Sequence, residues 1–96
     1  MRVYISGPMR GHTRDDVQRR FNNAEAWCRR NGRKVFNPSR WYWLMRHLPY
    51  KWCLAIDILM MCFCDEIYLL DGWRDSGGAR IEHDFAELIG MRLRYE

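Results

Sequence analysis

The fold is decided by residues 67–83, which read IYLLDGWRDSGGARIEH. The first four residues are apolar and β-prone, so they predict a buried strand. After a polar loop, apolar residues return at Ile81, Phe85, Leu88 and Ile89, a spacing that predicts one face of a helix. The stretch is therefore a strand–loop–helix junction, with a helix expected over 78–89 and Glu82 in its first turn.

The start of this expected helix is suited to binding an anion. The first N–H groups of a helix have no acceptor within the helix, and the helix dipole adds partial positive charge there. Gly77 and Gly78 open the helix, and the Glu82 carboxylate follows closely. A carboxylate beside an anion site suggests a substrate with a phosphate or hydroxyl end and a bond to be attacked.

The rest of the chain predicts an α/β domain. Strands are expected over 2–5, 34–37, 66–70 and 91–95, and helices from a cap at Thr13 or Asp15 to Asn31-Gly32 and over 52–64. The aromatic segment 39–51 predicts a short helical turn and a loop. Buried strands joined by crossover helices predict a short parallel sheet of about four strands with helices on both faces.

Two distant loops are expected to form one site. In parallel α/β sheets, ligands bind at the carboxyl ends of the strands where the winding direction switches. The loops after the first and third strands both end there, which brings residues 7–11 close to residues 76–82. The predicted binding residues of the first loop are Gly7, Pro8, Met9, Arg10 and Gly11.

Length and composition indicate one domain and exclude some classes of protein. A chain of 96 residues forms a single domain, and Asp57 and Asp65 interrupt the best apolar run before it reaches the roughly 18 residues of a membrane span. The first strand enters a turn at once, without the apolar region of a signal peptide, so we expect a cytoplasmic protein. The cysteines form no C-x-x-C motif, which favours core thiols over a disulfide or a metal site.

The net charge of +4 leaves the kind of anionic partner open. Arginines gather between Arg14 and Lys34, and Trp41, Tyr42 and Trp43 follow them. Such a face is usually solvated, but it can also attract nucleic acid, with aromatic rings stacking on bases. A small anionic ligand would use the same field.

Three side chains could carry chemistry, each with a simpler alternative. Glu82 is either a nucleophile or base at an anomeric carbon, or a residue that complements the helix dipole. Asp57 lies in an apolar helical segment, where it either faces solvent or points into the crevice. Tyr4 is either a core residue or a phenol that orients a carboxylate. Arg10 could bind a phosphate or lie on the surface.

Three separated motifs together resemble a known group. These are VYISGPMRG at 3–11, the spacing from Asp57 to Cys64-Asp65, and SGGARIEH at 76–83. The chain resembles the nucleoside 2-deoxyribosyltransferase superfamily, and especially its small phage- or prophage-encoded members. The resemblance implies a flavodoxin-like, Rossmann-type three-layer fold, cleavage or exchange of the N-glycosidic bond of deoxynucleosides or their 5′-monophosphates, no metal or organic cofactor, and a homo-oligomer.

The resemblance also implies roles for individual residues. Glu82 matches the nucleophilic glutamate, Asp57 the family's aspartate, and Tyr4 the tyrosine of the first strand. Ser76 and Gly78 match the phosphate-binding serine and glycine of the branch that hydrolyses deoxynucleoside monophosphates. Transferases of free nucleosides usually carry an aspartate at the serine position, so this chain resembles the hydrolase branch.

The chain also departs from the larger enzymes of the group. It is shorter, so C-terminal strands and residues that often complete a neighbour's site are missing or replaced. The aromatic segment 41–52 has no counterpart in the catalytic pattern, and it could bound the base pocket or form a subunit interface.

Three functions follow as hypotheses. The first is an N-glycosidase or deoxyribosyltransferase acting on a nucleotide or nucleoside. The second is a binding protein that keeps the pocket and sequesters a nucleotide-like signal without turning it over. The third is a small basic accessory protein that binds nucleic acid.

Overall fold

The computed structural model, which describes residues 1–45 and 47–96, contains a parallel four-stranded sheet in the order β2-β1-β3-β4. In chain order the elements are β1 (Arg2–Ser6), α1 (Arg14–Arg30), β2 (Lys34–Phe36), α2 (Ser39–Met45), α3 (Tyr50–Met61), β3 (Glu66–Leu69), the 3-10 turn η1 (Trp73–Asp75), α4 (Gly77–Leu88) and β4 (Arg92–Tyr95). The predicted three-layer α/β fold is confirmed. The chain leaves β1 toward β2 and then crosses to β3 on the other side, so the switch point lies between β1 and β3.

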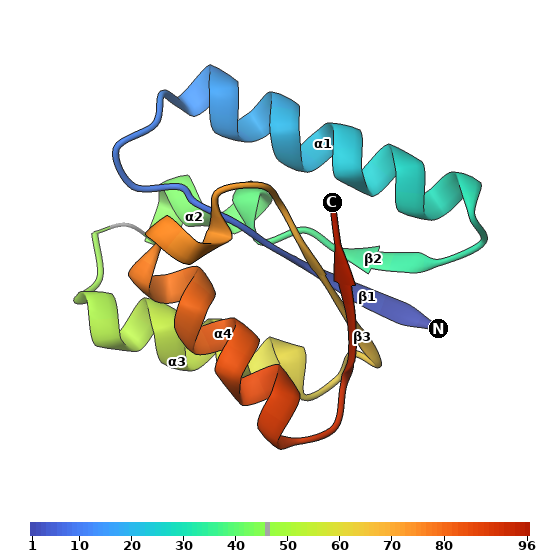
Figure 1. Cartoon of the computed structure of the whole chain (residues 1–96). Helices are drawn as coiled ribbons and strands as arrows, with labels where there is room; N and C mark the ends of the chain where they lie inside the picture. Colours follow the sequence, from blue (N-terminus) through green and yellow to red (C-terminus); the bar gives the residue numbers. More distant parts are fainter. Residues whose placement is uncertain (46) are drawn as a thin grey trace.

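The alternation of side chains along β1 divides the core between two layers. Val3 and Ile5 pack with Phe21 and other residues of α1 on one face. Tyr4 packs on the opposite face with Met61 of α3 and Ala86 of α4. Figure 1 shows α1 along one side of the sheet and α3 and α4 together along the other. Because successive residues of a strand point to opposite faces, Ser6 shares the face of Tyr4 and points toward α3 and α4.

Helix boundaries follow from capping and correct some of the expected ones. Thr13 caps α1, its hydroxyl accepting from the Asp16 N–H at 3.2 Å, as predicted. Ser76 caps α4 by accepting from the Ala79 N–H at 3.3 Å, so the helix begins at Gly77. Glu82 therefore lies in the second turn and not in the first, and the first turn of α4 contains no acidic residue.

The aromatic segment is more helical than the sequence pattern predicts. Residues 39–45 form a short helix, α2, and α3 already begins at Tyr50 and ends at Met61, earlier than the expected 52–64. Pro49 precedes Tyr50 and occupies the N-cap position, which ends the loop and starts the helix. The predicted loop therefore shrinks, and Tyr42 and Tyr50 are fixed on helices.

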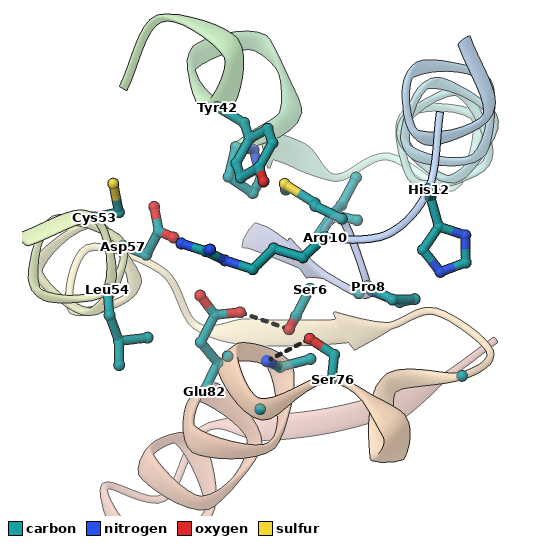
Figure 2. Close-up of a pocket in the computed structure, with 18 of the residues that line it drawn as sticks. Ser6, Pro8, Arg10, His12, Tyr42, Cys53, Leu54, Asp57, Ser76 and Glu82 are labelled. Carbon is teal, nitrogen blue, oxygen red and sulfur yellow. Dashed lines mark hydrogen bonds between the residues drawn. The ribbon is translucent and has the colours of Figure 1, made fainter. Parts of the chain in front are cut away.

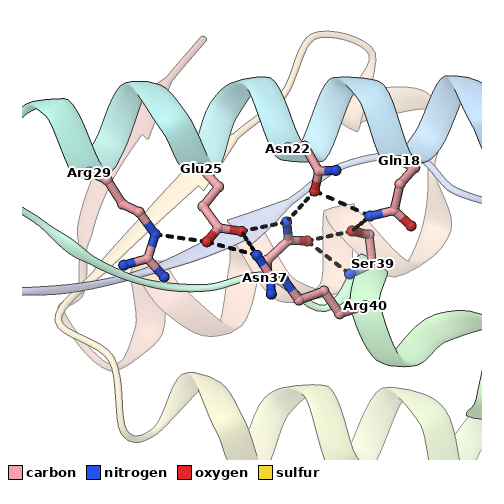
Figure 3. A network of polar contacts seen from close by, with 7 residues as sticks. All are labelled: Gln18, Asn22, Glu25, Arg29, Asn37, Ser39 and Arg40. Carbon is pink, nitrogen blue, oxygen red and sulfur yellow. Dashed lines mark hydrogen bonds and ion pairs between the residues drawn. The ribbon is translucent and has the colours of Figure 1, made fainter.

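A buried polar network joins α1 to the turn between β2 and α2 (Figure 3). Asn37, which is 4% exposed, donates to Glu25 Oε1 at 3.0 Å, and its Oδ1 accepts from the Ser39 N–H at 3.0 Å. Arg29 and Arg40 pair with Glu25 at 2.8 and 3.1 Å. Burial opposes ionisation of Glu25, but hydrogen bonds from Asn37, Arg29 and Arg40 outweigh it and lower its pKa. The network holds the turn that carries Pro38 and leads into α2.

The four cysteines are free thiols in different surroundings. Cys28 and Cys64 are buried in the core, as predicted, whereas Cys62 is exposed and Cys53 is half-buried. Cys62 occupies the C-cap position of α3. Within the described part of the chain, no helix is both long and apolar enough to cross a membrane.

We predict that Asn37→Ala lowers the free energy of unfolding by about 1–3 kcal/mol, because the buried Glu25 and Ser39 lose a partner that alanine cannot replace. Urea unfolding followed by circular dichroism measures the loss. The control is Asn23→Ala on the same helix as Glu25; Asn23 is exposed, and its replacement should change stability by less than about 0.5 kcal/mol. Equal effects of the two substitutions would contradict the structural role of the network.

Candidate functional site

A pocket of about 320 Å³ opens at the carboxyl ends of β1 and β3 (Figure 2). The loop after β1 forms part of its wall, α3 another, and the start of α4 a third. The predicted meeting of two distant loops is therefore observed. Seven predicted residues of these loops and of α4 line the pocket, namely Gly7, Pro8, Met9, Arg10, Ser76, Gly78 and Glu82.

Glu82 is buried at the pocket and held by two residues of β1. Its side chain is 6% exposed, and its Oε2 accepts a hydrogen bond from the Tyr4 hydroxyl at 3.0 Å. Its Oε1 accepts a second hydrogen bond from the Ser6 hydroxyl at 2.7 Å. Tyr4 and Ser6 reach one carboxyl because they are two residues apart on a strand and share a face. The dipole explanation for Glu82 does not fit, since the residue lies beyond the first turn of α4.

Asp57 comes to the same place from α3. It lines the pocket together with Tyr50, Cys53 and Leu54, and these four positions recur at the spacing of one helix face. Asp57 and Glu82 line the same pocket, and the charge of Asp57 acts on Glu82. Asp57 thus points into the crevice and not to solvent.

The surroundings of the two carboxyl groups favour one shared proton. Burial, with the charge of Asp57 adding to it, raises the pKa of Glu82 to about 8, although hydrogen bonds from Ser6 and Tyr4 oppose the rise. Burial also raises the pKa of Asp57 to about 6. Burial and the Glu82 charge raise the pKa of Tyr4 well above its ordinary value, so the phenol stays a donor. Near neutral pH the pair holds one proton, mainly on Glu82.

Tyr50 and Arg10 lie near the start of α4, in a pocket that Asp71 and Asp75 also line. Tyr50 approaches Gly78 so closely that a Cβ there would lie 3.0 Å from the phenol oxygen. The Arg10 guanidinium lies over the Tyr50 ring, 4.4 Å from its centroid. His12 and Arg20 also line the pocket. Together with the N-terminal N–H groups of α4, these groups suit an anionic ligand.

The two glycines of the loop after β1 have different roles in the structure. Gly7 must be glycine, because a Cβ would come within 2.9 Å of the Leu70 side chain at the end of β3. Gly11 does not line the pocket and instead bends the loop at a φ of 82°. Its predicted contact with a ligand is therefore not supported by the geometry.

Several pocket residues were missed in the sequence. Ser6 could have been found from the alternation that links it to Tyr4. Tyr50, Cys53 and Leu54 could have been found from their helical spacing to Asp57. Tyr42 belongs to the aromatic segment 41–52, which was expected either to bound the pocket or to form an interface, and it lines the pocket. Pro38 carried no such signal.

His83 and two exposed tryptophans lie outside the pocket. His83 stacks on Trp73 at 4.3 Å between ring centroids, and its Nε2 lies 3.2 Å from the Tyr95 hydroxyl, outside the pocket. Trp41 and Trp52 of the aromatic segment are exposed. Among residues 1–45 and 47–96, no three His, Cys, Asp or Glu side chains form a group that could hold a metal ion.

Glu82→Gln is expected to stabilise the protein at alkaline pH. Folding raises the pKa of Glu82 from 4.5 to about 8, so the folded state binds more protons between these values and stability falls as pH rises through them. A neutral glutamine avoids this loss. Melting temperatures of the variant and the wild type should therefore agree near pH 5, and the variant should melt several degrees higher at pH 9.

The control for this measurement is Glu87→Gln, an exposed glutamate on the same helix. It should follow the wild type at both pH values. A Glu82→Gln variant with the same pH dependence as the wild type would mean that Glu82 is ionised in the folded protein at neutral pH.

Comparison with known proteins identifies a family without naming an activity. No curated protein and no solved structure matches the chain. One family model matches residues 1–95, which is nearly the whole sequence and includes both loops of the pocket. The chain belongs to the family described as a domain of unknown function, DUF4406.

Proposed function

We propose that the protein cleaves or transfers the N-glycosidic bond of a nucleotide or nucleoside, with Glu82 as the nucleophile. The observation that carries this proposal is the buried Glu82, which accepts hydrogen bonds from Tyr4 and Ser6 and shares its pocket with Asp57 beside the N-terminus of α4. Two carboxyl groups with different proton affinities are the usual machinery for glycosidic bonds. The resemblance to deoxyribosyltransferases agrees with the same roles.

The leaving base needs a proton, and the carboxyl pair supplies it. As the bond between C1′ and the base nitrogen breaks, its electron pair stays on the base. The shared proton moves from Glu82 through Asp57 to that nitrogen, and Glu82, now ionised, bonds to C1′. Water, or a second base, then attacks C1′ and displaces the Glu82 carboxylate, and the proton that it gives up returns to the Glu82–Asp57 pair. Tyr4 stays protonated and holds the carboxyl in place.

The substrate is expected to carry a phosphate. Ser76, Gly78 and the N-terminal N–H groups of α4 would bind it, and the Arg10 cation stands at the same pocket. Anchoring this end would place C1′ over Glu82, which is how a distant binding group assists the reacting centre. The proposed chemistry uses no metal and no organic cofactor.

A binding protein without turnover is the second candidate, and a specific observation favours it. Both oxygens of Glu82 already accept hydrogen bonds, and its raised pKa keeps the group largely neutral near pH 7. A neutral carboxyl is a poor nucleophile but a good hydrogen-bonding partner for a sugar hydroxyl. Such a protein would sequester a nucleotide.

The third hypothesis, a nucleic-acid-binding accessory protein, stays a prediction. Arg19 pairs with Asp16 and Arg29 with Glu25, so part of the basic face is used within the chain. Tight, salt-sensitive binding of DNA that Arg19→Glu/Arg20→Glu abolishes would support it.

We predict that the protein releases free base from at least one deoxynucleoside 5′-monophosphate, measured by chromatography of a panel of four. Glu82→Ala should lower the rate at least about 1000-fold, because the nucleophile is lost. Asp57→Asn should lower it about 100-fold, because the proton donor to the base is lost. Glu87→Gln is the control and should retain the wild-type rate.

The same panel separates the two main candidates. Nucleotide-dependent thermal stabilisation without product, unchanged in Glu82→Gln, would favour the binding protein. Release of base by Glu82→Ala at the wild-type rate would exclude Glu82 as the nucleophile.

We propose further that the protein is a homo-oligomer that associates through the outer face of α3. Trp52 and Leu59 of this helix and Phe63 just beyond it are 58%, 54% and 64% exposed. Their spacing places them on one side of the helix, opposite Asp57. An apolar helix face is normally covered, and a second copy of the same face offers matching apolar cover.

Sedimentation velocity should therefore show a dimer or larger species that Leu59→Lys/Phe63→Lys converts to a monomer. Leu88→Lys places the same charge on α4 at an 83% exposed residue and should leave the oligomer intact. A monomeric wild type at micromolar concentration would overturn this proposal.

A further inference from the structure

Ser6 is an unexpected polar residue at the end of an apolar strand. It is 1% exposed, and it follows Val3, Tyr4 and Ile5, which are all fully buried. Burying a hydroxyl is costly unless it finds a partner. The partner of the Ser6 hydroxyl is Glu82 Oε1 at 2.7 Å, which is shorter than the 3.0 Å from Tyr4 to Oε2.

Two hydrogen bonds, one to each oxygen, fix the orientation of the Glu82 carboxyl more fully than one bond would. A single donor leaves the carboxyl free to rotate about its last torsion, whereas donors on both oxygens fix its plane. Both donors come from β1, the central strand that pairs with β2 and β3. The carboxyl is therefore oriented by an interior strand of the sheet and not by its own helix alone.

The same bond affects the charge of Glu82. The titratable groups that act on Glu82 are Asp57 from α3 and Tyr4 from β1, while burial acts against the ionised form. A hydroxyl that donates to a carboxylate favours the charged form. Ser6 thus works against burial and against Asp57.

We propose that Ser6 is a positioning residue that fixes the plane of the Glu82 carboxyl and holds it ready to ionise when the substrate takes up the shared proton. The proposal rests on the proposed glycosidic function. It extends that function to a residue that neither the catalytic motif nor the family model assigns. Ser6 acts through Glu82 and needs no contact with the substrate.

The test is a titration of Glu82 that does not depend on activity. Glutamate labelled with ¹³C at the side-chain carboxyl is incorporated, and the Glu82 signal is assigned by its loss in Glu82→Gln. In Ser6→Ala, the Glu82 titration midpoint should rise by about one pH unit, the size expected for a hydrogen bond to a charged group. Ser6→Thr keeps the hydroxyl and should remain within about 0.3 pH unit of the wild type.

Kinetics give the second readout. With an active wild type, Ser6→Ala should lower kcat about tenfold at pH 6.5 and leave KM within about twofold, since the change affects the nucleophile and not binding. The alkaline limb of the kcat profile, which reports loss of the shared proton from Glu82, should move up with the titration.

An unchanged Glu82 titration in Ser6→Ala would overturn the proposal, whatever the activity. If Ser6→Ala does not fold, Ser6→Cys, a weak donor of similar size, must move the midpoint in the same direction, and no shift there overturns the proposal as well. A wild type without activity on any nucleotide would refute the proposed function, while the titration would still decide whether Ser6 controls Glu82.

Discussion

The structure of the site depends on hydrogen bonds between β1 and Glu82 of α4. Tyr4 and Ser6 hold both carboxyl oxygens at 3.0 and 2.7 Å. These contacts exist only because α4 packs against the face of the sheet toward which Tyr4 and Ser6 point. A shift of one residue in β1 would turn both hydroxyls to the α1 side and leave a buried carboxyl without donors. The packing of the core and the hydrogen bonds to Glu82 therefore both depend on the register of β1 in the sheet.

Burial gives the carboxyl pair its chemical character. Away from water, Glu82 and Asp57 cannot both ionise easily at short range, so one proton stays between them near neutral pH. The proposed reaction uses this proton for the leaving base, and the same proton gives the binding hypothesis a neutral partner for a sugar. The choice between catalysis and binding thus depends on whether the ligand can accept the proton.

The remaining wall of the pocket comes from segments that carry no catalytic motif. The network of Glu25, Asn37 and Ser39 anchors the turn before α2, and Pro49 starts α3 so that Tyr50 reaches Gly78. Specificity for a base would depend on this wall. The carboxyl pair is carried by α3 and α4, which pack on the sheet.

The sequence by itself determined the parallel α/β order, the strand–loop–helix junction at 67–83 and the meeting of its loop with residues 7–10, because apolar periodicity and chain connectivity are local or topological properties. It also singled out Glu82, Asp57 and Tyr4. Only the tertiary structure decided that Glu82 lies in the second turn, that Ser6 is its second partner and that Gly11 turns away from the pocket. These outcomes depend on the cap at Ser76 and on the packing of helices against the sheet, which act between residues up to 78 positions apart.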